Sequence, residues 1–289
     1  MNDPKITLDQ AFGHCKSIAT SHYENFPVGS ILIPKRERKY FYALYGFMRT
    51  ADDYADLPSS GSSGERLEKL AIWRSHLEDI YLNKPATNPV FIALAETIHK
   101  FGFAKETFTR LLDAFEFDAK RDVRFTAYSD LRWYTARSAD PVGELVLGLF
   151  GYKDRELILL SDEICSGLQL LNFIQDLAED LRYSRYYFPT EDCDKFGLTQ
   201  KEIAQGGERV DKLVLYETVK TEEMIDKGAR LAELVSGRLR FELRAVVFGA
   251  RRVIGKIRQQ NGDVISKRPK LSKSEHVYIL LKSLVTKAA

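Results

Sequence analysis

The sequence predicts an all-α protein, and two observations lead to that prediction. Apolar residues recur at mixed three- and four-residue intervals, which is the period of a helix, while the alternating runs typical of strands are nearly absent. Prolines punctuate the chain between the periodic segments, where helices begin or end. The periodic segments are residues 70–81, 90–101, 105–117, 156–181 and 220–259. We therefore expect a bundle of helices around a buried centre.

The composition favours one globular domain over residues 1–289. The chain is 44% hydrophobic and 29% charged, which is typical of a globular chain with a large interior rather than a disordered one. We find no internal repeat and no long linker. Lysine and arginine number 43 against 41 acidic residues, so the overall charge does not favour nucleic acid as the main partner, and we expect none.

The cysteines and the apolar runs indicate a cytoplasmic protein. Cys15, Cys165 and Cys193 are odd in number and widely spaced, which favours reduced thiols over a disulfide framework or a zinc site. No apolar run reaches the roughly 18 residues that span a bilayer, and residues 1–10 lack the apolar core of a secretory signal. Peripheral membrane contact is left open for the basic run 267–273, although such clusters are more often simply solvated.

The segment RTADDYAD contains the first of two acid motifs. Asp52 and Asp56 are four residues apart and therefore point the same way from a helix, and Tyr45 and Arg49 continue that face. An isolated pair of this kind is more often a solvated acidic face. Here the pair follows the apolar, aromatic run FYALYGFM, where carboxylates are expected to need cations or hydrogen-bond donors.

The segment LQLLNFIQDLAED contains the second acid motif. Gln169, Asn172, Asp176 and Asp180 recur at three- and four-residue intervals, which predicts one stripe of roughly 16 Å along a continuous helix. The irregular stretch 182–196 follows, and we expect it to act as a lid.

Oxygen ligands of this kind predict a particular metal chemistry. Without nearby histidine or cysteine, they favour magnesium, calcium or manganese over zinc or copper. Magnesium prefers a few carboxylates together with phosphate oxygens, so two acid faces suit a diphosphate bridged by metal ions. Arg49 and Arg185 can each grip phosphate oxygens through two hydrogen bonds.

Aromatic residues near the motifs have two interpretations, both of which stay open. They either line a pocket for a hydrocarbon chain and face a carbocation, or simply pack in the core. These residues are Tyr45, Phe47, Tyr134 and Phe173.

These motifs resemble those of the squalene/phytoene synthase family. The family patterns DxxxD and (N/D)xxxDxxxD are matched by Asp52 to Asp56 and by Asn172 to Asp180. The interval between them, the arginine before the first and the RxYFP-like segment after the second also match, and the resemblance covers residues 17–270. It implies a type I isoprenoid synthase fold, a single helical bundle around a central cavity.

The resemblance also implies roles for individual residues. It implies roughly two or three Mg²⁺ ions and a prenyl diphosphate substrate. The implied metal ligands are Asp52, Asp56, Asn172, Asp176 and Asp180. The implied substrate contacts are His22, Asn25, Tyr45, Arg49, Gln169, Phe173 and Arg185. The implied catalytic residues are Arg49, Tyr134, Arg185 and Tyr187.

Within the family, four segments look most like bacterial hydroxysqualene synthases of the hopanoid pathway. They are ENFPVGSILIP, FMRTADDYAD, RSADPVG and NFIQD. This likeness implies a lyase that converts presqualene diphosphate to hydroxysqualene without NADPH. The alternative within the family is a transferase that joins two prenyl diphosphates head to head, giving squalene, dehydrosqualene or phytoene. Glu144 stands where many relatives have arginine.

Two readings from other classes are less favoured. One is a helical scaffold or binding protein whose acid motifs are only surface charge. The other is a helical hydrolase of nucleotide diphosphates, which usually uses ExxE patterns and no aromatic pocket.

Overall fold

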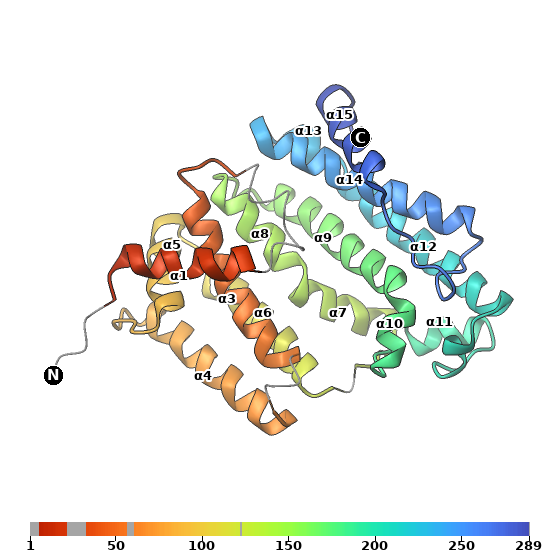
Figure 1. Ribbon diagram of the computed structural model, residues 1–289, viewed down its shortest axis with the longest axis horizontal. Helices are drawn as coiled ribbons and strands as arrows, with labels where there is room; N and C mark the ends of the chain where they lie inside the picture. Colours follow the sequence, from red (N-terminus) through yellow and green to blue (C-terminus); the bar gives the residue numbers. More distant parts are fainter. Residues whose placement is uncertain (1–5, 22–32, 57–60, 122, 289) are drawn as a thin grey trace. The chain divides into compact units, whose positions relative to one another are not determined.

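The computed structural model describes residues 6–21, 33–56, 61–121 and 123–288, and most of these residues are helical (Figure 1). No strand occurs among them, and one isolated bridge joins Arg124 to Tyr186. The predicted all-α class is therefore confirmed. The expected contacts His22 and Asn25 lie outside the described residues.

Contacts along the chain define two compact units. The first comprises Met1–Arg121 and Glu144–Lys153, and the second comprises Asp122–Gly143 and Asp154–Ala289. The expectation of a single domain over residues 1–289 stays a prediction.

Helix α3 is the centre of the first unit. It contacts each of the other four main helices of this unit, and its Phe47 is fully buried among the rings of Trp73, Phe91 and Phe108. Phe47 is therefore a core residue, so for this aromatic residue the core-packing interpretation holds. The helices are α1 (Leu8–Ser21), α3 (Arg38–Asp56), α4 (Ser63–Tyr81), α5 (Pro89–Phe101) and α6 (Lys105–Ala119).

Local sequence signals explain where these helices begin and end. Ser62 and Glu65 form a capping box at the start of α4. Asn88 caps α5, and Pro89 occupies its first position, where a missing N–H costs nothing. Gly102 ends α5 with a φ of 66°, a conformation that glycine adopts without strain.

Glu144 has partners within the first unit. Its carboxylate accepts a hydrogen bond of 2.7 Å from Thr107 Oγ1 and forms an ion pair with Arg110, both on α6. An arginine at this position would face Arg110, so the departure from the family pattern agrees with the local charges.

The second unit is built around α9 (Arg155–Gln175) and α12 (Glu208–Gly228), which lie side by side. Two glycines allow this close approach. A Cβ atom on Gly167 would lie 2.7 Å from Ile225, and one on Gly228 would lie 2.7 Å from the carbonyl oxygen of Leu160. By length and composition alone α9 would be long enough to cross a membrane, but it is a core helix of this unit.

Several of the remaining helices of the second unit contact this pair, and the last helix of the chain packs against α14. The predicted segment 220–259 is divided among the end of α12, α13 and α14. The helices are α7 (Tyr128–Ser138), α10 (Leu177–Arg182), α11 (Thr190–Lys195), η2 (Glu202–Gln205), α13 (Leu231–Leu234), α14 (Gly237–Gln259) and α15 (Lys273–Val285). Helix α8 (Asp140–Leu149) contributes residues to both units.

Candidate active site

The first acid motif occupies the C-terminal turns of α3. Arg49 lies one turn before it and divides its guanidinium between two carboxylates. One nitrogen lies 3.2 Å from Asp52, and another lies 2.6 Å from Asp53. The Nε atom of Arg49 is buried and has no hydrogen-bond partner among the described residues. Asp53 was missed by the sequence analysis, although its spacing of four residues from Arg49 was a usable signal.

Tyr45 lies on the same face of α3, as predicted, and is buried. Burial raises the pKa of its hydroxyl, Arg49 lowers it, and Asp52 and Asp53 raise it further. The tyrosine is therefore held as a neutral hydroxyl beside the charged cluster. Asp56 ends the helix, and its carbonyl oxygen accepts a hydrogen bond of 3.2 Å from Arg121.

The second acid motif does not lie on one continuous helix, so the predicted unbroken stripe was wrong. Helix α9 ends at Gln175, Asp176 adopts a non-helical conformation with φ −100° and ψ 8°, and α10 begins at Leu177. Asp176 still joins the two helices. Its N–H donates to the carbonyl of Asn172 at 2.8 Å, and its own carbonyl accepts from Asp180 N at 2.9 Å.

The middle carboxylate of this motif contacts the basic run 267–273. Asp176 forms an ion pair with Arg268, and the side-chain amide of Gln175 donates to the carbonyl of Pro269 at 2.7 Å. From the sequence this run was expected to be either solvated or lipid-facing, and Arg268 was not among the expected site residues. No local signal could have found it, because 92 residues separate Arg268 from Asp176.

Three of the predicted aromatic residues meet in the second unit. The rings of Phe173 and Tyr187 stack with centroids 3.6 Å apart, and Tyr134 lies 6.2 Å from each of them. Phe125, which the sequence analysis did not select, lies 5.6 Å from Tyr134. All four are buried, and Phe173 precedes Asp176 by one helical turn. The aromatic cluster and the second acid motif thus share one end of α9.

The segment 182–196 is anchored over most of its length. Tyr186 N donates to the carbonyl of Val123 at 2.9 Å, and Tyr187, Phe188 and Cys193 are buried. Helix α11, which lies within this segment, is held in place by the buried carboxylate of Asp192, which pairs with Lys220 of α12 at 2.6 Å. A lid would therefore be restricted to the exposed residues 182–184.

The other predicted contacts in this unit are less enclosed. Asn172 is exposed, whereas Gln169, Asp180 and Arg185 are half-buried. Arg185 follows α10 through Ser184, which has a φ of 57°, and the Arg185 backbone N–H donates to the carbonyl of Asp180 at 3.0 Å.

The acid motifs supply oxygen ligands but no ready-made cluster of carboxylates. Among the described residues, no group of three or more histidine, cysteine, aspartate or glutamate side chains lies close enough to hold a metal. The side chains of Asp52 and Asp176 are 41% and 33% exposed, so each can be reached by a hydrated cation. Each unit already places a guanidinium against its motif, which indicates that both motifs attract positive charge.

Comparison with known proteins identifies the chain's relatives. A hydroxysqualene synthase of Rhodopseudomonas palustris is 30% identical over 266 residues, which cover 91% of this chain and 88% of the relative. A presqualene diphosphate synthase of Sinorhizobium fredii is 30% identical over 193 residues, covering 67% of this chain and 68% of the relative.

Solved structures and the family profile agree with these relatives. A squalene synthase from Alicyclobacillus acidocaldarius superposes with a TM-score of 0.82 at 36% identity, covering 88% of this chain and 95% of that one. The likeness confirms the predicted isoprenoid synthase fold. The squalene/phytoene synthase profile matches residues 19–275, which includes both acid motifs and parts of both units. The chain therefore belongs to the squalene/phytoene synthase family.

Proposed function

We propose that this isoprenoid synthase converts presqualene diphosphate to hydroxysqualene in a magnesium-dependent reaction. The carbon–oxygen bond to diphosphate breaks, water adds to the resulting cation, and a proton and diphosphate are released. The observation that carries this proposal is the likeness to hydroxysqualene synthase, which extends over 91% of the chain at 30% identity. The likeness to presqualene diphosphate synthase covers a smaller part of the chain at the same identity.

The proposed ligands are of the chemical type that magnesium prefers. The ligands are Asp52 and Asp56 in the first unit and Asn172, Asp176 and Asp180 in the second, and all of them are oxygen donors. Bound magnesium would supply positive charge to the diphosphate leaving group. Arg49 and Arg268 would add to that charge from the protein, since each lies against a carboxylate of its own motif.

The aromatic cluster supplies the other requirement of this chemistry. A carbocation needs apolar walls that exclude water, and aromatic faces stabilise positive charge. The rings of Tyr134, Phe173 and Tyr187 offer both, and their two hydroxyl groups are the candidates for orienting the attacking water.

The test is a product assay in labelled water. The purified protein is incubated with Mg²⁺ and presqualene diphosphate in H₂¹⁸O, with and without NADPH, and lipid products are analysed by mass spectrometry. We expect labelled hydroxysqualene, an unchanged yield with NADPH, and no turnover after chelation. A product that is unlabelled, or squalene formed only with NADPH, would overturn the proposal.

The second candidate is head-to-head condensation of two prenyl diphosphates. It is favoured by relatives named presqualene diphosphate synthase and phytoene synthase. Incubation with farnesyl or geranylgeranyl diphosphate alone separates the two candidates. Formation of presqualene diphosphate, dehydrosqualene or phytoene from these substrates would support condensation, whereas the first proposal predicts no such product.

A further inference from the structure

Helix α15 turns its apolar side toward solvent. The buried side chains of this helix are Ile279 and the small polar residue Ser283. Large apolar side chains on the rest of the helix are between 47% and 84% exposed. These are Val277, Tyr278, Leu280, Leu281, Leu284 and Val285. A helix that only covered the protein core would show the opposite arrangement, so this face is suited to contact another apolar phase.

Positive charge surrounds this apolar face. From residue 264 to the end of the chain the only carboxylate side chain is Glu275, and it is already bound by Arg252 and Lys256 at 2.7 and 2.6 Å. The cationic residues in the same stretch are Lys267, Arg268, Lys270, Lys273, Lys282 and Lys287. Lys267, Lys270 and Lys273 are exposed, and no carboxylate among the described residues lies within ion-pair distance of them.

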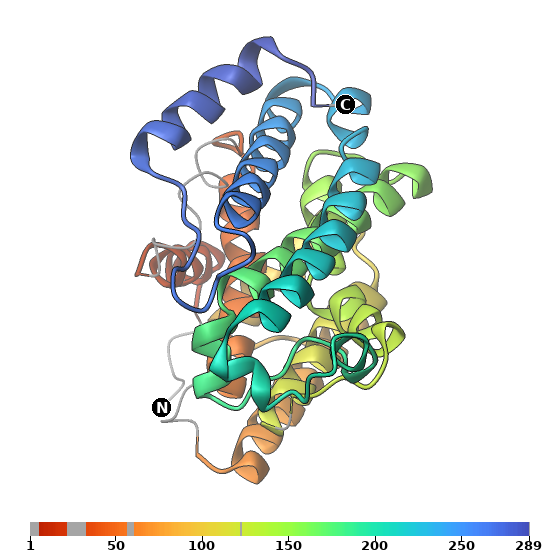
Figure 2. The ribbon, with the colours of Figure 1, turned by 90° about the vertical axis from the view of Figure 1, so that its right-hand side faces the viewer.

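A basic groove lies beside the helix. Its volume is about 410 Å³, and it runs between the C-terminal half of α14 and residues 267–270. Its lining includes Arg252, Lys256, Lys267, Arg268 and Lys270, and no carboxylate. Helices α14 and α15 pack against each other (Figures 1 and 2). A second hollow, of about 310 Å³, is lined by side chains from both helices.

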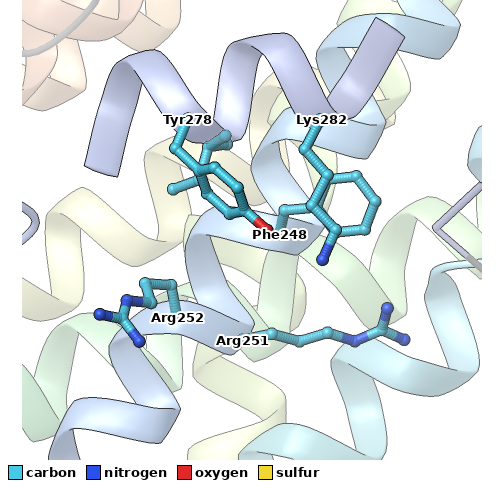
Figure 3. Close-up of a pocket in the computed structure, with 6 residues that line it drawn as sticks. Phe248, Arg251, Arg252, Tyr278 and Lys282 are labelled. Atoms are coloured by element: carbon cyan, nitrogen blue, oxygen red, sulfur yellow. The ribbon is translucent and has the colours of Figure 1, made fainter. Parts of the chain in front are cut away.

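Figure 3 shows how charged and apolar groups alternate in this second hollow. Tyr278 and Lys282 extend from α15 toward α14, where Phe248, Arg251 and Arg252 lie. The Nζ atom of Lys282 is 4.4 Å from the centre of the Phe248 ring. Aromatic and cationic side chains are therefore interleaved at the edge of the apolar face, as they are in segments that lie at a bilayer surface.

We propose that the face formed by α15 and residues 267–273 docks on an anionic lipid bilayer. The apolar side chains of α15 would enter the boundary between headgroups and acyl chains, while the lysines would contact anionic headgroups. The positive charge of this face favours an anionic bilayer over a second copy of the chain as its partner. Two copies related by a two-fold axis would bring the same cationic residues against each other.

The test is cosedimentation of the full chain with lipid vesicles. One set contains phosphatidylcholine alone, and the other contains phosphatidylcholine mixed with phosphatidylglycerol. We expect binding mainly to the anionic vesicles and weaker binding as NaCl rises, because salt screens the contact. Added inorganic phosphate at constant ionic strength is expected to leave binding unchanged, which separates a bilayer from a free-phosphate site.

Two matched pairs of variants test the residues. Neutralising three exposed lysines (Lys267→Gln, Lys270→Gln, Lys273→Gln) is expected to weaken binding roughly 100-fold, since each cation near an anionic surface contributes about a factor of five. The control neutralises Lys16, Lys120 and Lys201, which are also exposed. Leu281→Glu with Leu284→Glu is expected to weaken binding at least about tenfold. Its control is Ile72→Glu with Leu159→Glu, two exposed apolar residues elsewhere.

Folding and self-association are measured on the same variants. Circular dichroism is expected to show unchanged helix content, because the substituted side chains are exposed. Equal loss of binding in the control variants would overturn the proposal. So would analytical ultracentrifugation in which Leu281→Glu with Leu284→Glu dissociates an oligomer while vesicle binding is retained. Neither result depends on the product assay, so this inference and the proposed function can fail separately.

Discussion

The rings of Phe173 and Tyr187 lie face to face, with centroids 3.6 Å apart and planes inclined by 6°. Phe173 belongs to α9, whereas Tyr187 follows α10, so the stack ties the anchored segment after the second acid motif to the helix that begins the motif. Substitutions at Tyr187 can therefore distinguish what the stacked ring contributes to stability from what the hydroxyl group contributes to the reaction.

Tyr187→Phe is expected to keep the stack and the stability, because the ring is unchanged. Tyr187→Leu is expected to lower the free energy of unfolding by about 2 kcal/mol through lost packing. If the hydroxyl orients water, Tyr187→Phe will release diphosphate at a near-normal rate but form less alcohol product. Denaturant titration and a paired assay of diphosphate and lipid products measure both effects. Tyr183→Phe, in the same segment but 71% exposed, is the control and is expected to change neither quantity.

Asp176→Ala is expected to lower magnesium-dependent turnover more than about 100-fold, since even substitutions around a metal's direct ligands cost tenfold to 100-fold. Stability is expected to change by no more than about 1 kcal/mol, because Asp176 and Arg268 are both partly exposed. Turnover as a function of Mg²⁺ concentration and thermal unfolding check these outcomes. Glu179→Ala, an exposed carboxylate on α10, is the control. Normal turnover in Asp176→Ala would remove this residue from the metal ligands.

Arg49→Lys is expected to lower kcat roughly 100-fold, the usual cost of losing a donor that stabilises developing negative charge. A lysine ammonium cannot span the two carboxylates that Arg49 contacts, at 3.2 and 2.6 Å, nor offer a planar pair of donors to phosphate. Single-turnover kinetics locate the effect. Slow ionisation agrees with leaving-group stabilisation, and normal ionisation with slow product release contradicts it. Arg36→Lys, which is exposed and pairs with Glu37, is the control.

The burial of Glu242 is expected to make the free energy of unfolding depend on pH. Burial raises the pKa of its carboxyl from 4.5 to about 7, and its Oε2 atom has no hydrogen-bond partner in the described part of the chain. The folded-state pKa lies above the unfolded one, so the stabilisation present below pH 4.5 is lost as the pH rises to about 7. Glu242→Gln is therefore expected to be more stable than the wild type at pH 8, by about 3 kcal/mol, and similar to it at pH 4.5. Urea titrations across this range test the difference, and a constant difference at all pH values would contradict it.

The sequence predicted part of the helices and both acid motifs because these are encoded locally, whereas α1, α7, α8 and α15 were not among the predicted segments. The four-residue spacing from Asp52 to Asp56, and the caps at Ser62 and Asn88, act within one or two turns of helix. The break at Asp176 could not be predicted in this way. The segment around it has no glycine or proline, and the periodic pattern continues through it. What distinguishes this position is tertiary, namely the contacts that Gln175 and Asp176 make with Pro269 and Arg268.

The partners of Arg49 could be predicted from the sequence only as a pair of candidates. Asp52 and Asp53 are adjacent and both lie within reach of an arginine one turn earlier, so the pattern alone cannot rank them. The role of Phe47 depended on neighbours from three other helices. For Phe47 the missing information was long-range packing rather than local propensity.

The break at Asp176 has an electrostatic consequence for cation binding. Helix α9 ends at Gln175, so the carbonyl groups of its last turn lie at the second acid motif. These carbonyl groups carry the negative end of the α9 peptide dipoles, equivalent to about half an electron charge. That partial charge adds to the carboxylates and persists at any pH. A variant in which Asp176 is neutral would therefore keep a residual attraction for cations at this end of α9.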